Sequence, residues 1–327
     1  MSELHTFLFE GLPVRGMLVR ITGAWQEILR RRAEHPETGA YAPAVRDLLG
    51  EMTAAAVLMQ GNIKFNGALV LQVFGDGPLK LAVVEVQSDL QLRATAKQMD
   101  TLPDDATLST MVNQNRGGRC AITLDPQDRQ PGQQPYQGIV PLWDDHGQPL
   151  ESFQSVLEHY MLQSEQLDTT LVLAANGEVA AGLLIQRLPV QGEGNPSARA
   201  TRADEDEMGR NEDYRRIAML ASSLQKKELL TLDVDTVLRR LFWQEPLQRF
   251  QPKVGLEGPR FACRCSRERV SHMIRGLGRE EAESILAERE DIEVGCDFCG
   301  RQYRFDAVDA AELFTSVPPT PGTSSLH

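Results

Sequence analysis

Four cysteines near the C-terminus constrain this chain more than any other feature of its sequence. They form two close pairs, Cys263 with Cys265 and Cys296 with Cys299, separated by thirty residues. Two thiol pairs at such short spacing are typical of a tetrahedral zinc site made of four thiolates. The fold must therefore bring the two pairs together, and we expect one Zn2+ per chain, bound through all four sulfurs.

The two pairs differ in their spacing. The second pair has the CxxC spacing followed by Gly300, and glycine lets the turn tighten until backbone N–H groups face the sulfurs. The first pair is CxC, one residue shorter, and would close only a small, strained disulfide ring if it were oxidised. The spacing leaves two hypotheses open: a permanent structural zinc ion, or a zinc ion that a redox event removes.

Composition and charge exclude several classes of protein. The 327 residues are 41% hydrophobic and 24% charged, which is ordinary for a globular chain with more than one domain. The formal net charge of −12 disfavours nucleic acid as a partner. We expect no secretory leader, because the first residues have neither a basic nor an apolar region of the kind a leader needs. We expect no membrane span, because no run of eighteen or more apolar residues occurs. Five cysteines, one of them isolated, do not resemble a secreted disulfide framework, so we expect the reducing cytoplasm.

Residues 1–186 are predicted to form an α+β core domain with a sandwich-like mixture of strands and helices. An apolar stripe predicts a helix over 43–59 that stops at Gly61. The turn at 75–78 separates two β-rich runs, 69–74 and 79–86, and so predicts a hairpin. Further strands are expected at 120–124, 138–142, 170–174 and 179–186, and a helix at 152–163. Hairpins interspersed with helices favour this mixed packing over a doubly wound parallel sheet.

Residues 187–250 are predicted to be a flexible and helical linker. The part from 189 to 213 has too few large apolar side chains to fix itself, so we expect it to be mobile. Two amphipathic helices are expected at 217–230 and 234–242, and their apolar faces must lie against a partner. We interpret these faces as a candidate detachable cover. The candidate cover residues are Ile217, Leu220, Leu224, Val237, Leu238, Leu241 and Phe242.

Residues 251–314 are predicted to form a small zinc-binding domain, followed by a disordered tail over 315–327. Ser266 is the expected N-cap of a helix that runs to Arg275 with Gly276 beyond its end. A second helix is expected at 280–290, and short strands at 292–294 and 302–305. A unit of this size has a thin core, so a metal ion would supply much of its folding free energy.

No other motif in the sequence points to a catalytic site. The isolated Cys120 lies in a β-rich run and is expected to be a buried small hydrophobe. The residues after Cys299 are strand-like, which argues against a thioredoxin-type CxxC, because that motif begins a helix. Positive charge near the cysteines stabilises thiolates and favours their oxidation once a metal ion loosens. The flanking arginines are Arg264, Arg267, Arg269 and Arg301.

Several stretches of the chain, taken in order, carry a family resemblance. The cysteine segments are FACRCSRER at 261–269, CDFCG at 296–300 and YRF at 303–305. Others are GDGPL at 75–79, YQGIV at 136–140, SEQL at 164–167, ELLTL at 228–232 and VLRRLF at 237–242. Together they resemble the heat shock protein 33 family, the redox-switched holdase chaperones of bacteria. The segment at 192–210 is longer than the version usual in that family.

The resemblance implies an ATP-independent chaperone that oxidation activates. Reduced protein would hold zinc through the four thiolates and would be inactive. Oxidation would pair Cys263 with Cys265 and Cys296 with Cys299, release the zinc ion and unfold the small domain. The helical linker around 214–246 would then loosen and expose apolar surface that binds unfolding client proteins. The resemblance also implies a homodimer in the oxidised state.

Two competing hypotheses remain open at this point. A thiol oxidoreductase or a peroxidase would use Cys299 as its attacking thiol, and that thiol should be free of metal. A zinc-ribbon adaptor protein would bind its partners constitutively and would not change on oxidation. The metal content of freshly reduced protein tests the enzyme hypothesis, and activity before and after oxidation tests the adaptor hypothesis.

Overall fold

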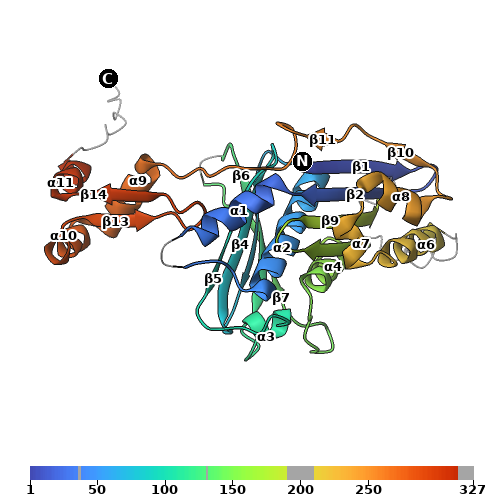
Figure 1. Cartoon of the computed structure of the whole chain (residues 1–327), viewed down its shortest axis with the longest axis horizontal. Coiled ribbons are helices and arrows are strands. Elements are labelled where there is room, and N and C mark those ends of the chain that lie inside the picture. The colour runs from blue at the N-terminus through green and yellow to red at the C-terminus, as the bar shows by residue number, and fades with distance from the viewer. Residues whose placement is uncertain (36–37, 130–131, 190–209, 316–327) are drawn as a thin grey trace, which may run out of the picture. The chain divides into compact units, whose positions relative to one another are not determined.

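The chain divides into two compact units, a large unit of Met1–Ala262 and a small unit that begins at Cys263. The computed structural model describes residues 1–35, 38–129, 132–189 and 210–315. Most of the predicted mobile linker and of the predicted C-terminal tail lies outside these residues. Strands and helices mix in both units, so the predicted α+β class is confirmed (Figure 1).

The first sheet of the large unit, sheet A, joins the beginning of that unit to its end. Its strands in spatial order are β10 (Leu247–Arg249), β1 (Glu3–Phe9), β2 (Val14–Ile21), β9 (Ala180–Arg187) and β8 (Thr169–Ala175), and β11 (Lys253–Val254) also pairs with β1. All neighbours are antiparallel. The predicted strands at 170–174 and 179–186 are confirmed as the β8–β9 hairpin.

The second sheet, sheet B, is built around the predicted hairpin at 69–86. Its strands in spatial order are β12 (Arg260–Phe261), β5 (Gln91–Gln98), β4 (Leu79–Gln87), β3 (Gly67–Phe74), β6 (Arg119–Pro126) and β7 (Tyr136–Pro141). The β3–β4 hairpin pairs Leu69 with Val86, as expected. The turn between the two strands needs glycine, because a Cβ on Gly75 would lie 1.8 Å from the carbonyl oxygen of Val112.

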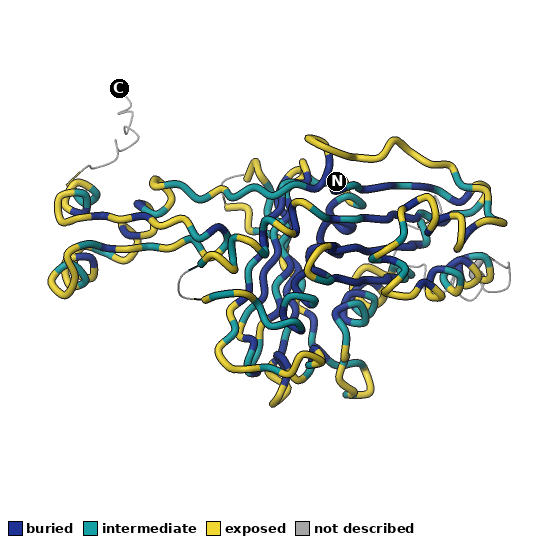
Figure 2. The backbone as a smooth tube through the Cα atoms, viewed as in Figure 1, coloured by how far each residue is buried: buried dark blue, intermediate teal, exposed yellow. Residues whose placement is uncertain are grey.

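One long helix fills the space between the two sheets. Helix α2 (Pro43–Asn62) confirms the helix predicted at 43–59 and starts with a proline in its first turn, where no N–H is lost. Most of its residues are buried, and it contributes to a core that draws on both sheets (Figure 2). Residues 52–60 of α2 are buried on every side of the helix, as expected for a helix in the interior of a protein. The remaining helices of this region are α1 (Gly23–Ala33), α3 (Leu108–Val112) and α4 (Phe153–Gln163).

Three helices cover the opposite face of sheet A and form a second core with it. They are α6 (Arg210–Ser222), α7 (Lys226–Thr231) and α8 (Val234–Phe242) (Figure 1). The Phe242 ring packs edge-on against Phe9 of β1, with 5.0 Å between ring centroids. These helices belong to the large unit, which extends past the predicted linker to Ala262. Whether the linker predicted at 187–250 and the zinc domain predicted at 251–314 unfold separately from residues 1–186 stays a prediction.

The single helix predicted at 217–230 is wrong, because the structure has two helices there. Helix α6 ends at Ser222 and α7 begins at Lys226. Gln225 is the N-cap of α7, and the Glu228 carboxylate accepts a hydrogen bond from the Gln225 N–H at 3.0 Å. This capping box starts a new helix, and Leu224 is buried in the break between the two.

Over residues 263–315, the described part of the small unit, the chain forms three helices and one short hairpin. Its elements are α9 (Arg267–Leu277), α10 (Arg279–Glu288), β13 (Ile292–Gly295), β14 (Gln302–Phe305) and α11 (Ala307–Thr315). Ser266 caps α9 as predicted, accepting a hydrogen bond from the Arg269 N–H at 3.2 Å. The helix ends later than expected, at Gly278 with φ 94° rather than at Gly276, because only Gly278 takes the conformation that stops it. None of the described helices in either unit is long and apolar enough to cross a membrane.

Candidate metal centre

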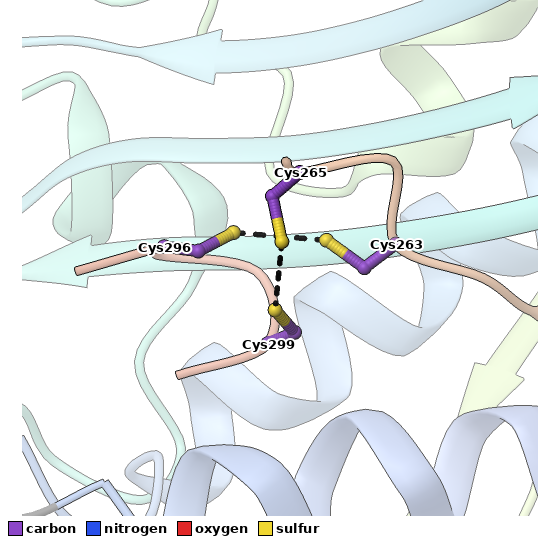
Figure 3. A group of neighbouring side chains, drawn as sticks. All are labelled: Cys263, Cys265, Cys296 and Cys299. Atoms are coloured by element: carbon purple, nitrogen blue, oxygen red, sulfur yellow. Dashed lines mark hydrogen bonds between the residues drawn. The ribbon is translucent and has the colours of Figure 1, made fainter. Parts of the chain in front are cut away.

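The structure brings the four predicted cysteine ligands into one cluster in the small unit. Cys263 and Cys265 lie in the segment before α9, and Cys296 and Cys299 lie in the turn between β13 and β14 (Figure 3). All four sulfur atoms lie within 4.8 Å of one another. The β13–β14 register, which pairs Gly295 with Gln302, fixes the turn that carries the second pair.

The spacing of the sulfurs fits a metal site and not a disulfide. The Sγ atoms of Cys263 and Cys296 are 3.6 Å apart, and those of Cys265 and Cys299 are 3.4 Å apart. A disulfide needs about 2.05 Å, and all five cysteines of the chain are free. Tetrahedral zinc with Zn–S bonds of about 2.3 Å implies sulfurs about 3.8 Å apart. Four thiolates at this spacing can hold one Zn2+ ion.

The turn around the second pair has the tight geometry that its CxxCG sequence predicts. The N–H groups of Cys299 and Gly300 donate to the Cys296 carbonyl at 3.2 and 2.8 Å. Gly300 takes φ 72°, which favours glycine. Backbone N–H groups of Phe298 and Cys299 face the Cys296 sulfur, although burial outweighs them and raises the pKa of that thiol. The turn therefore presents donors that stabilise a thiolate once a cation is present.

The Cys265 and Cys299 thiols differ in how readily they ionise. Burial opposes the Cys265 thiolate, but the Tyr303 hydroxyl donates to its Sγ at 3.1 Å. That bond and those from the neighbouring thiols outweigh the burial and lower the pKa of Cys265 to about 7. Burial raises the pKa of the Cys299 thiol. In the absence of a metal ion, the Cys265 thiol therefore ionises at lower pH than the Cys299 thiol.

The arginines near the cluster serve different purposes. Arg301 interacts with Tyr303 first and then with the charges of Cys265 and Cys299, which together raise the pKa of its guanidinium. This agrees with the prediction that arginine supports thiolates. Arg267 is engaged elsewhere: its guanidinium lies 4.1 Å from the centre of the Phe305 ring and pairs with Asp309 at 2.7 Å. Because Arg267 contacts β14 and α11 in this way, a role for it in stabilising the thiolates stays a prediction.

The fifth cysteine plays no part in the cluster. Cys120 lies in β6 of the large unit and has no exposed surface, and burial raises the pKa of its thiol to about 12. Such a thiol is inert, as predicted. His272, next to the cysteines in sequence, is exposed on α9 and does not join the sulfurs. The segment after Cys299 is strand β14 and not a helix, unlike a thioredoxin-type motif.

The predicted cover residues all lie in the core between sheet A and helices α6 to α8. Six are buried with at most 5% exposure, and Leu220 is partly buried against them. Sequence reasoning missed two contacts that bear on function. Tyr303 lies in the YRF segment but has no role that the sequence indicates. Arg20 gives no local signal, although its guanidinium donates to two carbonyls of α7 and to that of the C-cap residue Leu232.

Comparisons with known proteins agree over nearly the whole chain. A family model described as Hsp33 protein matches residues 2–306. The 33 kDa chaperonin of Chromobacterium violaceum is 45% identical over 313 residues, which cover 96% of this chain and 94% of that protein. The 33 kDa chaperonin of Methylobacillus flagellatus is 44% identical over 328 residues, covering 100% and 99% of the two chains.

A solved structure shares the fold. The crystal structure of a 33 kDa chaperonin from Thermotoga maritima aligns with a TM-score of 0.67 at 19% identity. The alignment covers 96% of this chain and 98% of that one. Both units of the present structure therefore have counterparts in a single known architecture.

Proposed function

The chain belongs to the Hsp33 family of chaperones, and from that premise we propose that it is an ATP-independent holdase which oxidation switches on. Family membership makes it a chaperone and not an enzyme, and its partners are unfolding client proteins. The observation that carries the redox part of the proposal is the cluster of four free thiols in a unit with few buried apolar residues.

In the reduced state, we place one Zn2+ ion among Cys263, Cys265, Cys296 and Cys299. A bound zinc ion would keep all four sulfurs ionised and would join the segment before α9 to the β13–β14 turn. The chain contributes the tight turn at Gly300 and the Tyr303 hydroxyl, which hold the sulfurs in position. Free thiols at rest require a reducing compartment, so we assign the protein to the cytoplasm.

Oxidation removes the ligands that the ion needs. We propose that Cys263 pairs with Cys265 and Cys296 with Cys299, each pair giving two electrons to an oxidant such as peroxide, which is reduced to water. Each new S–S bond joins two sulfurs at about 2.05 Å. Neither sulfur is then a thiolate, the form that binds zinc. The small unit then loses the cross-link between its halves, and its own apolar cluster is too small to keep it folded.

Release of helices α6 to α8 would turn the loss of the small unit into chaperone activity. Beneath these helices lie Phe7 and Phe9 of β1 and Leu18 of β2, all at most 2% exposed. Once uncovered, this face of sheet A would offer apolar surface to unfolding clients. The same surface would favour association of two oxidised chains, so we propose a homodimer in the active state. Nucleic acid and membranes are not expected partners.

The proposal is tested by following chaperone activity and zinc together. Reduced and peroxide-treated protein would each be mixed with a thermally unfolding model client, without nucleotide, while a chelating dye reports zinc release. We expect suppression of aggregation only after oxidation, with about one zinc ion released per chain. Equal suppression before and after peroxide would refute the redox switch and favour a constitutive zinc-ribbon adaptor.

A further inference from the structure

Helix α7 has the weakest apolar attachment of the three covering helices. It is six residues long, and only Leu229 among its residues is fully buried. Helix α8 buries five residues, including Val237 and Leu241. Helices this short are not stable alone in water, so α7 keeps its shape only while other groups hold its ends.

A single arginine from the sheet holds the C-terminal end of α7. Arg20 of β2 points to the same face of sheet A as Leu18, toward the covering helices. Its Nη1 donates to the carbonyl oxygens of Leu229 and Leu232 at 2.7 and 2.9 Å, and its Nη2 donates to that of Leu230 at 3.2 Å. The last carbonyls of a helix lack partners within the helix and carry its negative end, so a cation is well placed there.

The guanidinium of Arg20 has no competing acidic partner among the described residues. Glu3 pairs with Arg20 in the strand register, but its carboxylate accepts a hydrogen bond from His5 Nε2 at 2.9 Å. Hydrogen bonds from a charged donor are stronger than neutral ones, and three of them converge on one turn of backbone. Arg20 is thus committed to the end of α7.

The other end of α7 is held by a weaker contact. Lys226 Nζ lies 2.6 Å from the Glu51 carboxylate of α2, and the Lys226 side chain is 65% exposed while that of Glu51 is 12% exposed. Solvent screens the exposed partner of this pair and so reduces its contribution to stability. Leu229 and the ion pair of Glu228 with Arg240 of α8 also hold α7, but Arg20 is the main polar attachment of its C-terminal end.

We propose that Arg20 is the positioning residue that keeps α7 folded on sheet A in the reduced protein and so sets how easily the cover opens. This inference rests on the proposed function, because it assigns the control of cover release to one side chain. Loss of the three carbonyl bonds would unfold α7 first. Since α7 connects α6 to α8, both neighbours would then lose their fixed connection.

The test compares Arg20→Met with Arg239→Met in reduced, zinc-loaded, full-length protein. Arg20→Met keeps the aliphatic stem but removes every donor, and Arg239 lies on the exposed side of α8. We expect amide hydrogen exchange over 226–232 to become about tenfold faster or more in Arg20→Met. Exchange over 69–86 should stay unchanged, and Arg239→Met should match the wild type throughout. Arg20→Met should also suppress client aggregation partially in reducing buffer.

Three outcomes would overturn the assignment. Wild-type exchange over 226–232 in folded Arg20→Met would show that the bonds do not hold α7. Fast exchange without any activity in reducing buffer would show that α7 does not control the cover. If Arg20→Met does not fold, Arg20→Lys takes its place, with about threefold faster exchange expected, and unchanged exchange there overturns the proposal. Inactivity of the oxidised wild type would instead refute the proposed function. The exchange data would still show whether Arg20 keeps α7 folded.

Discussion

The large and small units are stabilised in different ways. The large unit has two extensive apolar cores, one around α2 and one beneath α6 to α8 (Figure 2). The small unit has one cluster of six buried residues, Ile274, Ala282, Ile292, Tyr303, Phe305 and Ala310. On the proposed function, a zinc ion held by its four cysteines would supply a cross-link where apolar burial is lacking. A chemical event at the sulfurs would then unfold the small unit and leave the large unit intact.

Loss of one sulfur should have the largest effect and should fall on the small unit alone. We expect Cys296→Ser to abolish stable zinc binding and to unfold the small unit, because structural zinc sites supply roughly 10–16 kcal/mol. Metal analysis of anaerobically purified protein measures this directly, and Cys120→Ser is the control, with one zinc ion retained per chain. Full zinc occupancy in Cys296→Ser would show that the cluster is not the site.

Charges placed beneath the cover should separate its release from the loss of zinc. Burial of each leucine contributes about 1.5–3 kcal/mol, and a glutamate cannot stay unpaired in that contact. Leu238→Glu/Leu241→Glu should therefore give partial holdase activity in reducing buffer with zinc still bound. Arg239→Glu changes the charge on the exposed side of the same helix, so this control should have no holdase activity in reducing buffer. A double variant that is folded, zinc-loaded and inactive would refute the detachable cover.

Alkaline pH should weaken the large unit through a cysteine that has no part in the metal site. The folded state raises the pKa of Cys120 from 9.0 to about 12. Above about pH 9 the unfolded chain loses this proton first, so stability falls by up to about 1.4 kcal/mol per pH unit. Cys120→Ala should remove that part of the slope in denaturant unfolding at pH 8 and pH 10. Equal slopes in the two proteins would contradict the assigned shift.

Removal of one helix cap in each unit should have the smallest effect, and it should show whether the two units are independent. Ser266 caps α9 and Ser152 caps α4, and each accepts a backbone hydrogen bond at 3.2 Å. Replacing either with alanine costs about 1 kcal/mol. Because folding and metal binding are coupled in the small unit, Ser266→Ala should weaken zinc affinity about fivefold. Ser152→Ala should leave zinc affinity unchanged, and equal losses would mean that the two units are not independent.

The metal site could be predicted from sequence because its signal is local. The spacing of Cys296 and Cys299, with Gly300 after them, specifies a tight turn wherever that turn lies. The β3–β4 and β8–β9 hairpins could also be predicted, because their strands are rich in β-branched and large aliphatic residues. Strand β5 was missed because its buried positions include Ala94 and Ala96, and alanine does not favour strands.

Other features could not be predicted because they depend on distant parts of the chain. The two-residue strands β11 and β12 exist only through pairing with the sheet edges at β1 and β5. The N-terminal hairpin has a local signal, the alternation of Phe7 and Phe9 along β1. Arg20 and α7 are more than 200 residues apart, and no spacing rule connects them. Polar contacts of this kind become visible only in the folded structure.

Regional hydrogen exchange before and after peroxide treatment tests most directly whether oxidation unfolds the small unit and the covering helices but spares the core around β3 and β4. We expect oxidation to remove protection from 263–315 and from 214–242, while 69–86 in β3 and β4 stays as protected as in the reduced protein. Zinc release measured on the same sample should follow the same time course. Loss of protection across 69–86 as well would mean global unfolding, and unchanged protection in the small unit after zinc release would mean that the metal does not hold it; either result would contradict the account.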